Sequence, residues 1–67
     1  MELSARNQLQ GVVKSVELGA VMAEVVVDVG GQEMASSITV NSAERLGLQP
    51  GDIVTVIVKS TDVIIGK

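Results

Sequence analysis

The chain contains no phenylalanine, tyrosine or tryptophan, so any core must be built from small branched side chains. Valine occurs 13 times and isoleucine five times, which favours β-strands. The chain is one domain over residues 1–67, and a domain this short buries only about 60% of its unfolded surface. Disulfides, metals or oligomerisation usually stabilise such domains, and cysteine and histidine are both absent here. We therefore expect the chain to oligomerise.

Charge and composition also limit the classes of function. The formal net charge of −3 opposes non-specific binding to nucleic acid or to an anionic membrane. No apolar stretch approaches the length of a bilayer span and no signal peptide is visible, which predicts a soluble, cytoplasmic protein. Without histidine or cysteine as base, nucleophile or ligand, we expect neither enzymatic activity nor direct protein–metal bonds.

The first half of the chain predicts three strands. Residues 7–18 form the first, with Gly11 as a bend or bulge. Residues 23–31 form the second, which ends at the hairpin signal Gly30-Gly31. The hairpin makes residues 32–40 its antiparallel neighbour.

A short helix follows the third predicted strand. Asn41 is the expected N-cap, and Glu44 stands three positions later at the capping-box spacing. Gly47 occupies the place of a left-handed C-cap. Proline and glycine in "QPGD", residues 49–52, then predict a β-turn.

The last part of the chain predicts a long strand over residues 53–60 and a short one over 62–67. The runs 25–27 and 56–58 are apolar on both strand faces, so one face needs a cover, most simply another copy of the chain. The alternative is that these runs only reflect strand propensity. Five strands and one helix predict an all-β fold, a small OB-type β-barrel, closed or partly open.

Two of the five cations have unusual neighbours. Arg6 and Lys59 are flanked by small or hydroxyl-bearing residues, namely Ser4, Ala5, Ser60 and Thr61. Guanidinium, ammonium, hydroxyl and backbone N–H groups all donate hydrogen bonds, as an oxyanion requires. Ordinary surface charge is the alternative interpretation for both residues.

Several motifs resemble the molbindin or Mop family of small molybdate-binding domains, which are related to TOBE domains. They are "SARNQLQG" near the start, "GAVMAEVVVDVGG", "ITVNSAERLGLQPGD" and "VIVKSTDVIIG". Their order and spacing cover residues 3–66, so the resemblance extends over nearly the whole chain.

The resemblance implies an OB-like barrel that assembles into a homo-hexamer, a trimer of dimers. Molybdate or tungstate would bind at the subunit interfaces, with no organic cofactor. Ser4 and Arg6 would donate through side chains and Ala5 through its backbone N–H. Thr39 and Ser42 match polar residues at the end of the third strand and the start of the helix. Lys59 and Ser60 match the residues that the other subunit would contribute to complete the site.

The turn formed by Gly19, Ala20 and Val21 is a candidate second oxyanion site near a symmetry axis. It carries no charge, so it would act as a nest of backbone N–H groups. A plain turn is the alternative.

A donor-only site suits molybdate or tungstate, which are fully deprotonated dianions at neutral pH. Phosphate keeps a proton that needs an acceptor, whereas sulfate is not excluded by this argument and must be separated by size. The expected function is therefore cytoplasmic storage or homeostasis of molybdate or tungstate. The alternatives are an OB-fold nucleic-acid-binding module, which lacks its basic groove and aromatics here, and an enzyme that delivers metal to a cofactor.

Overall fold

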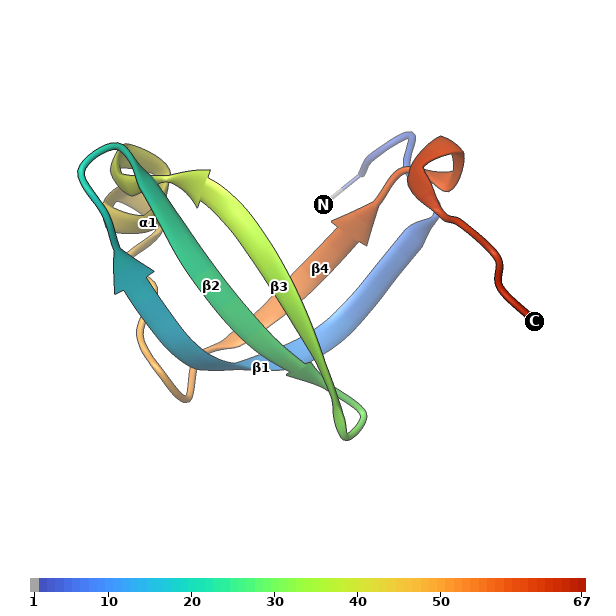
Figure 1. The fold of residues 1–67 in the computed structure, drawn as a ribbon, viewed down its shortest axis with the longest axis horizontal. Helices are drawn as coiled ribbons and strands as arrows, with labels where there is room; N and C mark the ends of the chain where they lie inside the picture. Colours follow the sequence, from blue (N-terminus) through green and yellow to red (C-terminus); the bar gives the residue numbers. More distant parts are fainter. Residues whose placement is uncertain (1) are drawn as a thin grey trace.

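The computed structural model describes residues 2–67 and consists of one curled antiparallel sheet with a short helix (Figure 1). The strand order in the sheet is β3-β2-β1-β4. The strands are β1 (Asn7–Leu18), β2 (Met22–Val29), β3 (Gln32–Thr39) and β4 (Ile53–Val58), with helix α1 (Val40–Leu46) between the last two and a 3-10 turn, η1 (Ser60–Asp62), after them. Helix α1 lies at one end of the molecule, and the chain's C-terminus at the other.

Four of the five expected strands and the single helix are therefore present, but the fifth strand is not. The chain forms the turn η1 where the last strand was expected to begin, and residues 63–67 continue without a strand partner. Ile64 and Ile65 are 92% and 85% exposed. A strand needs neighbouring backbone to satisfy its N–H and C=O groups, and a single chain offers this segment none. Since β3 and β4 are both sheet edges, the sheet is open.

The core is small and made of valine. Val13, Val25 and Val27 are buried together, while Val26 between the last two faces the opposite side and is half-buried. An open apolar groove of about 200 Å³ runs beside them toward the inner face of β4. The molecule exposes 5283 Å². A compact monomer of this mass exposes about 4000 Å², so this chain leaves an unusually large surface uncovered.

Gly11 is not the site of the bulge in β1. The register between β1 and β2 shifts between Val13 and Ser15, which leaves Lys14 as the extra residue. Gly11 is buried instead against β2. A Cβ atom there would lie 2.5 Å from Cγ1 of Val27 and 2.8 Å from the carbonyl oxygen of Asp28. Glycine is needed at this position because β2 approaches too closely for any side chain.

The glycine turn signals are confirmed. Gly30 and Gly31 close the hairpin between β2 and β3 with φ angles of 58° and 91°, and the Gly31 N–H donates to Oδ1 of Asp28 at 2.9 Å. Gly47 ends α1 in the left-handed region with φ 63°. Residues without a glycine's freedom rarely adopt these angles, so the sequence marks the turns directly.

The N-cap of α1 was predicted wrongly. Thr39, not Asn41, caps the helix: its Oγ1 accepts the Ser42 N–H at 3.0 Å and is also 2.8 Å from Ser42 Oγ. Strand β3 passes directly into α1, so the chain turns two residues earlier than the spacing of Asn41 and Glu44 suggests.

This assignment predicts opposite outcomes for two substitutions. Thr39→Val keeps the side-chain shape but removes the cap, so it should lower the free energy of unfolding by about 1 kcal/mol. Asn41→Ala lies inside the exposed first turn and should leave it nearly unchanged. Urea unfolding at one fixed protein concentration compares the two. If Asn41→Ala lost more unfolding free energy than Thr39→Val, Asn41 would be the N-cap that the capping-box spacing predicts.

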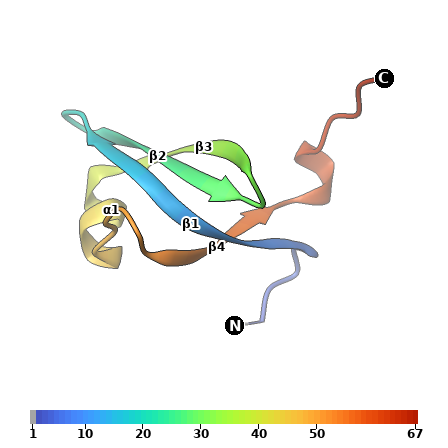
Figure 2. The same ribbon diagram turned by 90° about the horizontal axis from the view of Figure 1, so that it is seen from below.

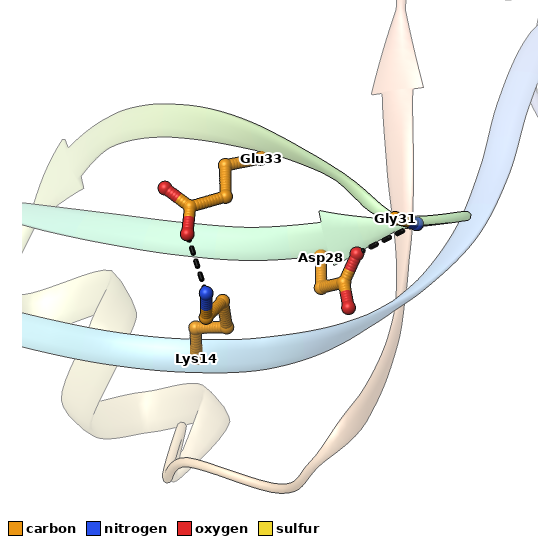
Figure 3. Close-up of polar contacts among 4 residues, drawn as sticks. All are labelled: Lys14, Asp28, Gly31 and Glu33. Carbon is orange, nitrogen blue, oxygen red and sulfur yellow. Dashed lines mark hydrogen bonds and ion pairs between the residues drawn. The ribbon is translucent and has the colours of Figure 1, made fainter.

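An ion pair links the edge strand β3 to β1 across β2. Figure 3 shows Glu33 reaching over β2 to the ammonium of Lys14 at the bulge. The hydrogen bond that Lys14 donates to the Glu33 carboxylate, and then the negative charge of Glu33, raise the pKa of Lys14 above its ordinary 10.5. The stability that this ion pair contributes is fully present below the ordinary lysine pKa and is lost as the pH rises through the raised pKa of Lys14. Both side chains are more than half exposed, so solvent screens the pair and it contributes little.

Candidate functional site

The N-terminal segment and the C-terminal end of β4 lie at the same end of the β1–β4 ladder. Asn7 of β1 is paired with Val58 of β4, and this is the last residue pair of the ladder. Arg6 and Lys59 each come one residue beyond it, so the two cations flank the same ladder end. Three further predicted residues are next to these cations in the sequence: Ser4 and Ala5 precede Arg6, and Ser60 follows Lys59. We call these five residues the cationic end.

The two cations of the cationic end form no ion pair within residues 2–67. Over residues 2–67 the ion pair of Lys14 and Glu33 is the only one, so Arg6 and Lys59 have no carboxylate partner. Both side chains are exposed. The nearest carboxylate after Ser60 along the chain is Asp62, in the turn η1. A chain with a net charge of −3 thus presents two free cations beside hydroxyl groups.

The other predicted residues lie at the opposite end of the sheet. Thr39 and Ser42 stand where β3 enters α1, and their hydroxyls are hydrogen-bonded to each other. The turn between β1 and β2 is attached here, because the Val40 N–H donates to the Val21 carbonyl at 2.8 Å. Figure 2, turned by 90° from the first view, shows the same separation of α1 from the C-terminal end. We call Thr39 and Ser42, together with the adjoining turn of residues 19–21, the helix end.

The proposed anion nest at residues 19–21 has fewer free donors than its sequence suggests. The Gly19 N–H donates to the Met22 carbonyl at 2.9 Å, which closes the turn. A Cβ on Gly19 would lie 2.8 Å from that same carbonyl oxygen, so glycine has a structural role here. Ala20 and Val21 are exposed, and they are the members of this turn left to present N–H groups outward.

One chain therefore brings together some of the seven residues predicted for the main site and separates the others. The pairing of β1 with β4 brings Arg6 and Lys59 to one ladder end, and Ser4, Ala5 and Ser60 are their near neighbours in the sequence. Thr39 and Ser42 lie beyond the far end of β1, where Met22 pairs with Thr39. A site that uses all seven residues must draw on two chains. Within one chain Lys59 and Ser60 follow the strand end beside Arg6, so Thr39 and Ser42 would come from the other chain, and not Lys59 and Ser60 as the resemblance implied.

Other kinds of site find little support in the described residues. Within residues 2–67, no three His, Cys, Asp or Glu side chains gather closely enough to hold a metal ion. The groove of about 200 Å³ is lined mainly by valine, leucine and isoleucine, so it does not suit an anion. No helix in this part of the chain is long and apolar enough to cross a membrane.

Comparison with known proteins agrees with these features. The family model of the TOBE domain matches residues 3–65. The chain belongs to the TOBE domain family. Molybdenum-pterin-binding protein 2 of Clostridium pasteurianum is 48% identical over 66 residues, which cover 97% of both chains.

Solved structures of TOBE relatives share the whole fold. A molybdate-binding protein from Sporomusa ovata superposes with a TM-score of 0.96 at 43% identity, and the match covers all of both chains. The cytoplasmic molybdate-binding protein ModG, solved with molybdate bound, matches with a TM-score of 0.90 at 45% identity. That match covers 96% of this TOBE chain and 46% of ModG. The relatives are named as binding proteins, and they do not favour the nucleic-acid alternative.

Proposed function

We propose that this TOBE protein binds molybdate or tungstate at the cationic end and stores the ion in the cytoplasm. The proposal rests on one observation above all. Arg6 and Lys59 flank the same ladder end, beside Ser4 and Ser60, and neither has a carboxylate partner within residues 2–67. Such a group donates hydrogen bonds and positive charge, which is what a fully deprotonated dianion accepts.

Short-range bonds must supply the affinity, because the net charge of −3 repels an anion at long range. A hydrogen bond to a charged group contributes about 1.5–3 kcal/mol. Three to five of them, less the cost of ordering the donors, correspond to roughly micromolar dissociation constants. Arg6 and Lys59 would supply the charge, and Ser4, Ser60 and the Ala5 N–H would supply the remaining donors.

The complete site is proposed to lie between chains. Thr39 and Ser42 can join Arg6 only if the helix end of one copy meets the cationic end of another. The excess exposed surface of about 1300 Å² supports such contacts, since a standard interface buries about 800 Å² on each partner. Repetition of these contacts would give the homo-hexamer, a trimer of dimers, that the family resemblance implies.

The barrel would be completed in the same assembly. Residues 63–67 belong to no strand or helix, and Ile64 and Ile65 are almost fully exposed, while β3 and β4 each keep a free edge. An edge strand pairs readily with an added strand, which would satisfy the backbone of both. We propose that residues 62–67 become the fifth strand by pairing with another copy.

The turn containing Ala20 and Val21 would form the second, uncharged anion site where several copies meet.

The relatives support the choice of ion and compartment. Molybdate is the ligand named for the Sporomusa ovata and ModG structures, and ModG is described as cytoplasmic. Storage fits a binding protein with many sites per assembly. Tungstate is proposed beside molybdate because the two dianions are nearly equal in size, and a donor-only site does not separate them.

Native mass spectrometry of the whole chain tests the proposal, with molybdate, tungstate, sulfate or phosphate added. We expect a hexamer that takes up several molybdate or tungstate ions and ignores phosphate. Sulfate should bind weakly because it is smaller than the spacing that suits molybdate. A monomer, or an oligomer that treats all four ions alike, would overturn the proposed function.

A further inference from the structure

A side chain outside the predicted site holds the N-terminal segment in place. Gln8, the second residue of β1, turns its amide back along the chain, and its Nε2 donates to the Ala5 carbonyl at 2.9 Å. Residues 2–6 precede β1 and belong to no strand or helix. Among the described hydrogen bonds outside the helices and strands, none other reaches residues 2–6.

The bond acts on the peptide unit that leads into Arg6. The Ala5 carbonyl and the Arg6 N–H belong to one planar unit, and the chain has no cis peptide bond within the described residues. In a trans unit the carbonyl and the N–H point in opposite directions. Fixing the Ala5 oxygen therefore also fixes the direction of the Arg6 N–H and the point from which the Arg6 side chain leaves the backbone.

We infer that Gln8 is a positioning residue for Arg6, the oxyanion donor that follows this peptide unit. The inference rests on the proposed function. Gln8 need not touch the ion: its hydrogen bond keeps the segment in the arrangement that the ion requires. When a protein holds its binding arrangement only part of the time, its affinity falls by that fraction. Loss of this bond should therefore weaken binding without removing any donor.

The chain offers a matched pair of substitutions. Gln8→Met keeps an unbranched side chain of similar length but removes the amide donor. Gln10→Met makes the same change two residues along β1, on the same strand face, at a residue that is also exposed and has no side-chain hydrogen bond described. Both variants alter an exposed position in the strand segment paired with β4, so they should unfold at closely similar urea concentrations.

Two measurements on the full-length chain test the inference. Calorimetric titration with molybdate should show an affinity about three- to tenfold lower for Gln8→Met than for the wild type. NMR relaxation of the ligand-free protein should show greater backbone motion at Ala5 and Arg6 in Gln8→Met. Gln10→Met should match the wild type in both measurements, and native mass spectrometry should give all three the same assembly.

The possible failures are distinguishable. If Gln8→Met binds molybdate as tightly as Gln10→Met, or leaves Ala5 and Arg6 as rigid as in the wild type, the positioning role is wrong while the proposed function stands. If the wild-type chain itself takes up no molybdate, the proposed function is overturned, and the positioning role falls with it.

Discussion

Replacing Arg6 with alanine is expected to remove most of the affinity for molybdate and leave the assembly intact. Arg6 is one of two cations at the cationic end, and it lies before β1 with an exposed side chain. Its loss removes a charge-assisted hydrogen bond, and with it about 10- to 100-fold in the dissociation constant. The fold should survive because Arg6 makes no ion pair within residues 2–67. Calorimetric titration measures the affinity, and native mass spectrometry measures the assembly.

Two further variants separate the position of the charge from its amount. Lys14→Ala removes one positive charge from the middle of β1, away from both ends of the sheet, and should bind molybdate nearly as the wild type does. Arg6→Lys keeps the charge but loses the planar fork of donors, so its affinity should lie between those of wild type and Arg6→Ala. Normal binding by Arg6→Ala would show that the ion binds elsewhere.

Gly11→Ala is expected to destabilise the fold strongly for the addition of a single methyl group. The added Cβ would meet Val27 Cγ1 at 2.5 Å and the Asp28 carbonyl oxygen at 2.8 Å. A side chain can rotate away, but the carbonyl belongs to the β2 backbone, so the two strands must separate. We expect a loss of about 1–3 kcal/mol in the free energy of unfolding, a large share of the stability of so small a domain.

The control for this prediction is Gln10→Ala. Gln10 precedes Gly11 in β1, and its side chain is exposed with no hydrogen bond described. It should therefore unfold close to the wild-type urea concentration. Both variants must be compared at one protein concentration, because the stability of an oligomer depends on it. A stable Gly11→Ala variant would mean that β2 lies farther from β1 than the structure has it.

Local features of this protein could be predicted because they depend on neighbouring residues. The span of β1 was predicted correctly as residues 7–18, since alternating side chains and flanking turn residues mark a strand directly. The turn glycines at 30, 31 and 47 were also identified, because positive φ angles favour glycine. The same locality explains an error: Asn41 has the right spacing for a cap, but β3 extends to Thr39 and brings the helix start forward.

Three features depend on contacts between distant residues, so no local pattern reveals them. The bulge falls at Lys14 instead of Gly11 because the register with β2 sets it. Residues 62–67 have strand composition and no strand, because a strand forms only where another backbone accepts its hydrogen bonds. The Gln8 amide looks like any polar strand residue until the fold shows that it turns back to Ala5.

The candidate site also has a part that the sequence predicts and a part that only the fold decides. The residue types, small hydroxyl neighbours around Arg6 and Lys59, could be recognised in the sequence, since donor chemistry is a property of the side chains themselves. Their meeting could not, because β1 and β4 are not consecutive strands and only their pairing brings the two cations to one ladder end. The separation of Thr39 and Ser42 from that end is likewise a consequence of topology. Side-chain chemistry belongs to individual residues, whereas their distances depend on which strands pair across the whole chain.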